Sequence, residues 1–240
     1  MFYRIGAPVD FYTLEDLRHP DFPEYKLYVF LNAWAVDRDL KIALDRLKKN
    51  RATFVWFHAP GIILENKFDP DNVSAVCGIQ IQPLAELAAK VEYRPQDNVP
   101  FLAEAKSVVS GISGIEPLFY PVGDAVTFGR LVEHPAGAVK DFGAWRSIYF
   151  SAPVMTPELL RKIAADAGCG IYNENSADML YIGGKLLGIH TGAKGFKTIG
   201  LPGPCRIKDL LTDEILTPIA SEKIEFQMET GETRLFEILP

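Results

Sequence analysis

Polar side chains that follow apolar runs are the residues of this chain most able to do chemistry. Asn32 and Trp34 come after one such run, His58 comes after another, and Asp124 lies between two more. The carboxyl ends of parallel strands meet at one edge of an open α/β sheet, where ligands bind. These four residues are therefore our candidates for a ligand crevice. Each of these residues also has a simpler interpretation. His58 would be a loop histidine hydrogen-bonded to backbone, Trp34 would pack in the core, and Asp124 would be a turn residue.

Carboxylates could form an acid–base pair, which a glycosidase needs with its two carboxyl groups about 5 to 10 Å apart. Asp10, Glu15 and Asp16 lie close together in the sequence. Nothing in their pattern brings two of them together across a sugar-sized pocket, and Glu15 and Asp16 are more simply capping or solvated groups. We predict no catalytic residue in this chain.

A metal or phosphate site is not indicated either. His19, His134 and His190 lack the HxxxH or HxH spacing that brings two imidazoles to one ion. The glycines between residues 183 and 203 follow no GxGxxG or Walker pattern, so we interpret them as turns between strands. The sequence therefore predicts no metal and no cofactor.

Composition limits the class of protein and of partner. The 240 residues are 48% apolar, and the net charge of −6 is spread without a basic run, so we expect neither nucleic acid nor a membrane as a partner. No apolar run approaches the roughly 20 residues that span a bilayer, and Met1–Arg4 lacks the features of a signal peptide. We expect a soluble chain whose compartment is open. The odd set of cysteines favours buried free thiols, although the sequence does not decide whether two of them meet: Cys77, Cys169 and Cys205.

The stretch Tyr25–Gly61 is the unit that would position the crevice residues. Lys26–Leu31 predicts a buried strand, Asp37 opens a helix whose apolar side includes Ile42, and Ala52–Phe57 predicts a second buried strand. The right-handed crossover rule makes the two strands parallel. The chain is therefore predicted to be an α/β protein.

Further elements are predicted before and after this unit. Ala7–Tyr12 is expected to form a strand. If it lies at the edge of a flavodoxin-type sheet of order 2-1-3-4-5, the missing partner is a strand upstream of Met1. Short helices are expected at Leu14–Leu17, Val73–Cys77 and Leu84–Glu92.

The middle of the chain predicts several strands and one capped helix. Thr156 is a good N-cap, and the helix that it opens is expected to form a second crossover unit closing on Gly170–Tyr172. Gly123-Asp124 indicates a hairpin or a loop between the first two of these strands. The strands are expected at Leu118–Val122, Ala125–Val132, Ala138–Phe142 and Trp145–Ser151.

From Asn173 the pattern changes to closely spaced short strands separated by glycine and proline turns, without a helical period. Such a pattern is typical of a small antiparallel sandwich or barrel. We therefore place a boundary near residue 172. A flavodoxin-like domain with a parallel sheet is predicted over residues 1–172, and a small β-sandwich domain over residues 173–240.

Several segments carry a resemblance to a known family. They are IGAPVDFYTLEDL, PEYKLYVFLNAWAVD, TFVWFHAPG, WRSIYFSAPVMTPELLRKIAADAGCGIY and SADMLYIGGKLLGIHTGAKGFKTIGLP. Together they resemble the non-catalytic tail of large bacterial glycoside hydrolases related to the β-galactosidases of family 42. In that family a flavodoxin-like trimerisation domain, similar to class I glutamine amidotransferases, follows a catalytic TIM barrel. The resemblance covers most of the chain and implies assembly and support of a catalytic domain, whose acid and nucleophile glutamates this chain does not contain.

The sequence departs from a working amidotransferase at one turn. That fold carries a cysteine nucleophile at a tight elbow between a strand and a helix, and the equivalent turn here is His58-Ala59-Pro60-Gly61. Without a thiol or hydroxyl, His58 has no nucleophile to activate. We expect an inert elbow.

Three hypotheses about function follow. We favour the non-catalytic part, or a stand-alone relative, of a carbohydrate-active hydrolase, with an upstream catalytic domain or further copies of itself as partners and carbohydrate as a further candidate ligand. Whether the chain is an enzyme by itself stays open. The alternative is a small hydrolase on sugar-derived substrates, using the crevice near Asn32 and His58. A flavin or nucleotide sensor rests on fold analogy alone.

Overall fold

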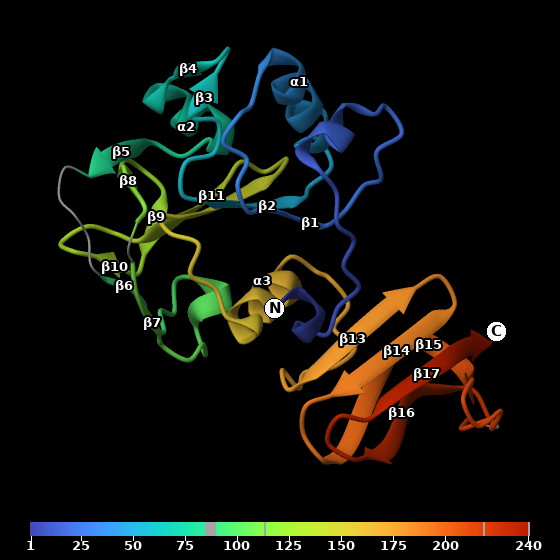
Figure 1. The fold of residues 1–240 in the computed structure, drawn as a ribbon. Coiled ribbons are helices and arrows are strands. Elements are labelled where there is room, and N and C mark those ends of the chain that lie inside the picture. Colours follow the sequence, from blue (N-terminus) through green and yellow to red (C-terminus); the bar gives the residue numbers. More distant parts are fainter. Residues whose placement is uncertain (85–89, 113, 218, 240) are drawn as a thin grey trace. The chain divides into compact units, whose positions relative to one another are not determined.

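The computed structural model describes residues 1–84, 90–112, 114–217 and 219–239, and this part of the chain forms two compact units (Figure 1). The mixed-sheet unit is Tyr12–Met155. The β-unit combines Met1–Phe11 with the chain from Thr156 onward. Packing therefore divides the chain earlier than the predicted boundary near residue 172, and the division into domains 1–172 and 173–240 stays a prediction.

A five-stranded sheet forms the centre of the mixed-sheet unit, in the order β1-β2-β12-β11-β9. The first three strands are parallel to one another, as predicted for the first two, whereas β11 runs antiparallel to both of its neighbours. The prediction of a parallel sheet is therefore correct for three strands only, and the sheet as a whole is mixed. Its strands are β1 (Leu27–Phe30), β2 (Thr53–Phe57), β12 (Arg146–Phe150), β11 (Gly137–Asp141) and β9 (Val126–Phe128).

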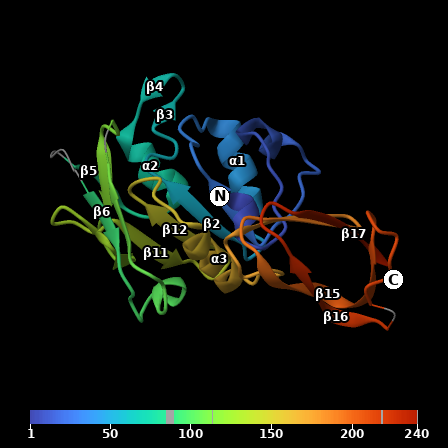
Figure 2. The same ribbon diagram turned by 60° about the horizontal axis from the view of Figure 1, so that its bottom comes forward.

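Two helices, α1 (Arg38–Leu47) and α2 (Pro70–Cys77), lie on the same side of this sheet (Figures 1 and 2). The carboxylate of Asp37 caps α1 by accepting a hydrogen bond of 2.9 Å from the Leu40 amide, as the sequence predicted. The buried side of α1 joins the core formed by the sheet, but Ile42 is exposed and does not belong to it. Burial of this apolar layer stabilises the unit.

The first residues of the chain do not form the strand predicted over Ala7–Tyr12. Two short 3-10 helices, η1 (Phe2–Arg4) and η2 (Leu14–Arg18), flank an irregular segment instead. The second of these confirms the predicted helical turn, and Asp16 caps it through the Thr13 amide at 2.7 Å. Gly6, just before the predicted strand, accepts the Tyr172 and Asn173 amides, and its φ of +75° turns the chain there, whereas residues 7–12 form no strand.

Small antiparallel sheets complete the mixed-sheet unit. The helix predicted at Leu84–Glu92 is wrong where the structure describes it, because both ends lie in strands, and residues 85–89 lie outside the described residues. The predicted runs before and after Gly123 do not pair as a hairpin, since β8 (Leu118–Pro121) pairs with β5 (Ile81–Leu84) and β9 pairs with β11. The elements are β3 (Ile63–Leu64), β4 (Lys67–Phe68), β5 (Ile81–Leu84), β6 (Lys90–Tyr93), η3 (Pro100–Leu102), β7 (Val108–Gly111), β8 (Leu118–Pro121) and β10 (Arg130–Leu131).

In its described residues the β-unit contains one α-helix, α3 (Pro157–Asp166), besides the 3-10 helix η1, and a five-stranded antiparallel sheet of order β13-β14-β17-β15-β16. The Thr156 hydroxyl caps α3 by accepting the Leu159 amide at 3.2 Å, as predicted. The prediction of a second crossover unit is wrong, because residues 170–172 form no strand. The antiparallel pairing confirms the prediction of antiparallel strands after Asn173. These strands are β13 (Asp178–Gly183), β14 (Leu186–Thr191), β15 (Gly195–Asp209), β16 (Ser221–Met228) and β17 (Thr233–Leu239).

Helix length bears on the membrane question. None of the helices in the described part of the chain is long and apolar enough to cross a bilayer.

Candidate functional site

His58 follows β2 at the carboxyl edge of the parallel strands and has an unusual backbone, with φ of +62°. Its amide donates to the Phe150 carbonyl at 2.8 Å, and its own carbonyl accepts the Tyr149 hydroxyl at 2.5 Å. The ring Nε2 lies 2.7 Å from the Pro117 carbonyl oxygen. Burial lowers the pKa of His58, which favours the neutral ring. The predicted elbow is therefore strained and tied to backbone carbonyls.

The other crevice candidates lie at the surface. The carbonyl of the exposed Asn32 accepts the Trp34 amide at 2.8 Å. Trp34 is 48% exposed, so the favoured interpretation of core packing is wrong for this residue. Asp124 lies 2.6 Å from Lys140 Nζ, and this hydrogen bond lowers the pKa of the carboxyl group. Apart from this backbone bond between Asn32 and Trp34, no hydrogen bond or ion pair joins two of the four candidates in the part of the chain that the structure describes.

Two of the three thiols, Cys77 and Cys205, are unsuited to act as the nucleophile that the elbow lacks. Cys77 lies on α2, and complete burial raises the pKa of its thiol to about 12. Burial also raises the pKa of Cys205. A thiol with a raised pKa holds little thiolate near neutral pH, and the thiolate is the reactive form. These two cysteines are therefore packing residues, as expected for buried free thiols, whereas Cys169 is only half-buried.

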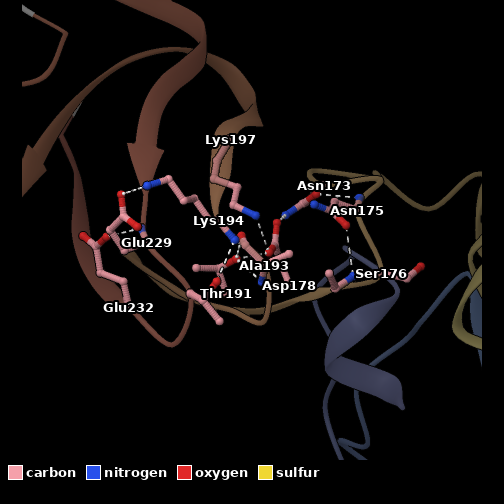
Figure 3. A network of polar contacts seen from close by, with 12 residues as sticks. Asn173, Asn175, Ser176, Asp178, Thr191, Ala193, Lys194, Lys197, Glu229 and Glu232 are labelled. Atoms are coloured by element: carbon pink, nitrogen blue, oxygen red, sulfur yellow. Dashed lines mark hydrogen bonds and ion pairs between the residues drawn. The ribbon is translucent and has the colours of Figure 1, made fainter.

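A group of buried polar side chains lies in the β-unit, and we call it the polar cluster: Asn173, Asp178, Thr191 and Lys197 (Figure 3). Lys197 Nζ lies 2.8 Å from Asp178 Oδ1, and neither side chain is more than 2% exposed. The Thr191 hydroxyl is 2.6 Å from the same oxygen, and Asn173 Nδ2 is 3.3 Å from the other one. The buried carboxylate is thus paired with a cation and hydrogen-bonded at both oxygens, as burial of a charge requires.

Sequence reasoning missed the polar cluster, although a signal for it exists. Asp178 stands two residues before Leu180, and Lys197 two residues before Ile199, and all four are buried on alternating positions of their strands. A charged residue in phase with buried apolar ones points inward. The two strands are not neighbours in the sheet, so the pairing becomes apparent only once the sheet has folded.

The polar cluster adjoins the place where the first residues of the chain join the β-unit. Figure 3 shows η1 beside the loop that carries Asn175 and Ser176. Arg4 donates to the Ser176 and Ala177 carbonyls at 3.0 and 2.8 Å. Asn175 in turn donates its amide to the Asn173 side chain at 2.7 Å. The cluster thus holds the loop that receives Arg4.

Arg161 of α3 makes a second set of contacts with this segment. Its guanidinium donates to the Ile5 carbonyl at 2.8 Å and to the Arg4 carbonyl at 2.7 Å. The Gly6 carbonyl accepts the Tyr172 amide at 2.7 Å, and a side chain at Gly6 would clash with the Asn173 carbonyl oxygen. Met1–Phe11 is therefore a tightly seated part of the β-unit.

Acid–base and metal chemistry receive little support from the carboxylates. In the described part of the chain, the buried carboxylates Asp178 and Asp209 are both beside cations, with Arg234 Nε 3.7 Å from Asp209. The described residues contain no group of three or more histidine, cysteine, aspartate or glutamate side chains that could hold a metal ion. The polar cluster is consequently suited to positioning the chain rather than to transferring protons.

Comparison with known proteins supports a fold assignment and no sequence family. No family model and no curated protein matches the chain by sequence. Among solved structures, a β-galactosidase from Bacillus circulans sp. alkalophilus matches 89% of this chain at 16% identity and a TM-score of 0.61. A catalytic mutant of Gan42B, a GH42 β-galactosidase from G. stearothermophilus, matches 99% of it at 14% identity and a TM-score of 0.61. A β-galactosidase from the haloarchaeon Halorubrum lacusprofundi matches 92% at 13% identity and a TM-score of 0.57.

These matches cover 33%, 35% and 32% of the solved chains, respectively. The chain thus spans about a third of the length of the β-galactosidases that it resembles. At these identities the likeness concerns the fold, which is that of one region of such enzymes.

Proposed function

We propose that this chain is a non-catalytic assembly and support region of a β-galactosidase-like glycoside hydrolase, acting through oligomerisation and domain contacts. The observation that supports the proposal most strongly is coverage: nearly the whole chain matches about a third of each solved β-galactosidase. In this proposal the mixed sheet is a reduced flavodoxin-like, amidotransferase-like domain of the trimerisation type, followed by a small β-domain. Its partners are a catalytic domain of a glycoside hydrolase or further copies of the chain.

The chemistry of the described residues agrees with a supporting role. The His58 ring is bonded to a backbone carbonyl, burial lowers its pKa and so favours the neutral form, and the Cys77 thiol is buried. A retaining glycosidase needs two carboxyl groups about 5 to 5.5 Å apart, one of them a nucleophile. The buried Asp178 and Asp209 instead lie beside Lys197 and Arg234.

Two measurements on the purified chain test this proposal. Light scattering after size exclusion is expected to give a mass that is a multiple of the 26.7 kDa chain. A chromogenic β-galactoside is expected to give no turnover under conditions in which a complete β-galactosidase is active. Turnover that one carboxylate substitution abolishes would overturn the non-catalytic assignment. A 26.7 kDa monomer at all concentrations, together with failure to bind a β-galactosidase catalytic domain, would overturn the assembly role.

The alternative of a small hydrolase at the crevice near Asn32 and His58 is favoured by one observation, the 48% exposure of Trp34 beside the exposed Asn32. An exposed indole is a good surface for a sugar ring. Chemical-shift mapping with a panel of monosaccharides would reveal binding there. Shifts at Trp34 that disappear in Trp34→Ala would support this alternative, and a silent Trp34 indole would count against it.

A further inference from the structure

Four aromatic side chains from three chain segments meet at the surface of the β-unit, and we call them the aromatic cluster: Phe2, Tyr3, Phe11 and Tyr181. The Tyr3 and Tyr181 ring centroids are 4.3 Å apart with the ring planes 37° apart. Phe11 meets both Phe2 and Tyr3 edge to face, with centroids 5.6 Å apart in each case. All four residues belong to the same unit, so their mutual arrangement is defined.

The aromatic cluster is not part of the hydrophobic core of this unit. That core is built from inward residues such as Leu180, Ile189 and Phe236. Tyr181 points to the opposite side of β13 from Leu180, and its cross-strand partner is Gly188, which has no side chain to cover the ring. Tyr181 is 44% exposed and Phe11 is 57% exposed. Because these rings are only partly buried, they contribute less to the stability of the folded unit than fully buried rings would.

The position of the aromatic cluster is rigidly set by the contacts around it. Tyr3 stands next to Arg4, whose guanidinium is bonded to the Ser176 and Ala177 carbonyls just before β13. Arg161 holds the Arg4 and Ile5 carbonyls. Preorganised aromatic surfaces bind with little loss of conformational entropy. The contacts thus fix Tyr3 against Tyr181 before any ligand arrives.

We propose that the aromatic cluster is a carbohydrate-binding platform that takes one pyranose ring of a galactoside, stacked on the open ring surface of Tyr181 and Phe11. One face of galactopyranose carries several C–H bonds that point the same way, and these are attracted to the negative face of an aromatic ring. The tyrosine hydroxyls can exchange hydrogen bonds with the sugar hydroxyls. The choice of galactose rests on the proposed function.

The size of the platform distinguishes a sugar from a protein partner. The exposed parts of Phe11 and Tyr181 together amount to about one aromatic side chain, on the order of 200 Å². A stable protein interface buries about 800 Å² on each partner. The exposed rings fall well short of that area even together with the neighbouring Leu235, which lies opposite Gly188 and is 37% exposed, and the rings by themselves match the face of a single sugar ring. Its rings carry no formal charge, which fits a neutral ligand rich in hydroxyls.

Saturation-transfer NMR with the full chain tests this proposal, with methyl β-galactopyranoside and lactose as the probes. We expect transfer to the protons of one ring face in the wild-type chain. Tyr181→Ala should weaken binding at least tenfold, whereas Tyr181→Trp should keep it, because the larger ring still stacks. Phe196→Ala is the matched control, since Phe196 is 67% exposed on β15 of the same unit and lies outside the aromatic cluster.

Several results would overturn the platform. The wild-type chain could show no saturation transfer to millimolar sugar. Tyr181→Ala could bind the sugar as well as the wild-type chain does, or Phe196→Ala could lose as much binding as Tyr181→Ala. Circular dichroism of each variant checks that it is folded, and if Tyr181→Ala unfolds, Phe11→Ala repeats the test on the other exposed ring, where unchanged binding would likewise overturn the platform. Failure of sugar binding with a multimeric mass intact would reject the platform alone. A monomer that still binds galactosides would reject the assembly role alone.

Discussion

The two units bury polar side chains in different ways. In the mixed-sheet unit, buried or half-buried polar side chains are bonded mainly to backbone carbonyls, such as Ser147 to Cys77 at 2.6 Å and Asn72 to Gly61 at 2.7 Å. In the β-unit, the polar cluster is centred on an ion pair between side chains, Lys197 and Asp178. A neutral contact to backbone adds modest stability, whereas a buried charge is costly whenever its partner is lost.

This difference shows what holds each unit in its shape. The mixed-sheet unit has a broad apolar layer between α1, α2 and the sheet, and its polar contacts only complete that layer. The β-unit has a smaller core and must also hold Met1–Phe11, which is far away in the sequence. Its charged and hydrogen-bonded residues therefore determine where that segment sits.

The largest expected effect comes from Lys197→Met, which leaves the Asp178 carboxylate buried without its cation. We expect a loss of about 3–5 kcal/mol in the free energy of unfolding of the β-unit, measured by urea denaturation. Lys223→Met is the matched control, because Lys223 pairs with Glu225 at the surface of the same unit and should cost less than about 1 kcal/mol. A loss below about 1 kcal/mol in Lys197→Met would remove the contrast between the two units.

Gly6→Ala should have the next largest effect, roughly 2–4 kcal/mol, because it combines an unfavourable φ with a clash against Asn173. Gly143→Ala isolates the first contribution, since Gly143 has φ of +74° and open space around it. We expect about 1 kcal/mol there. Thermal unfolding measures both losses of stability. Equal losses in the two variants would show that Met1–Phe11 is not packed tightly against Asn173.

Ser147→Ala should cost about 1–2 kcal/mol in the mixed-sheet unit, because the Cys77 carbonyl loses its partner in a buried site. Denaturation monitored by tryptophan fluorescence measures it, since Trp34, Trp56 and Trp145 all lie in this unit. Ser110→Ala, at an exposed hydroxyl, provides the control. If Ser147→Ala lowered the free energy of unfolding as much as Lys197→Met does, the two units would not differ in how strongly they depend on their buried polar groups.

The smallest effect is a pH dependence from His58. Burial lowers its pKa in the folded chain, so the unfolded chain binds the proton more readily. The stability contributed by neutral His58 is therefore present above the ordinary pKa of 6.5 and is lost as the pH falls below it. His58→Asn tolerates the positive φ and should flatten the stability profile between about pH 7.5 and 5. Identical profiles for the two proteins would contradict this assignment.

Local rules predicted the elements that local chemistry determines. The Asp37 and Thr156 caps and the buried run of β2 follow from residue types within a few positions. The irregular path of Ala7–Tyr12 could not be predicted in this way, because apolar alternation indicates an extended chain without naming its partner. The preceding residue, Gly6, is bonded to Tyr172 and Asn173, which are far away in the sequence.

The candidate site shows the same limit. Asn32, Trp34, His58 and Asp124 were selected by their position after apolar runs, and the structure places three of them at the surface and one against backbone carbonyls. Whether they bind a ligand stays a prediction. The polar cluster was detectable only as two charges in phase with buried residues, because their pairing depends on the curvature of a sheet in which the two strands are not neighbours.

The seat of Met1–Phe11 also has a consequence for synthesis on the ribosome. Arg4 leaves the ribosome before the mixed-sheet unit is made, whereas its partners Ser176 and Ala177 are made only after the whole of that unit. At about 5–20 residues per second, that interval is on the order of ten seconds or more. The mixed-sheet unit can fold during this time, while the exposed aromatic residues of the first segment wait for the β-unit. Closure of the β-unit is thus expected to follow folding of the mixed-sheet unit in the cell.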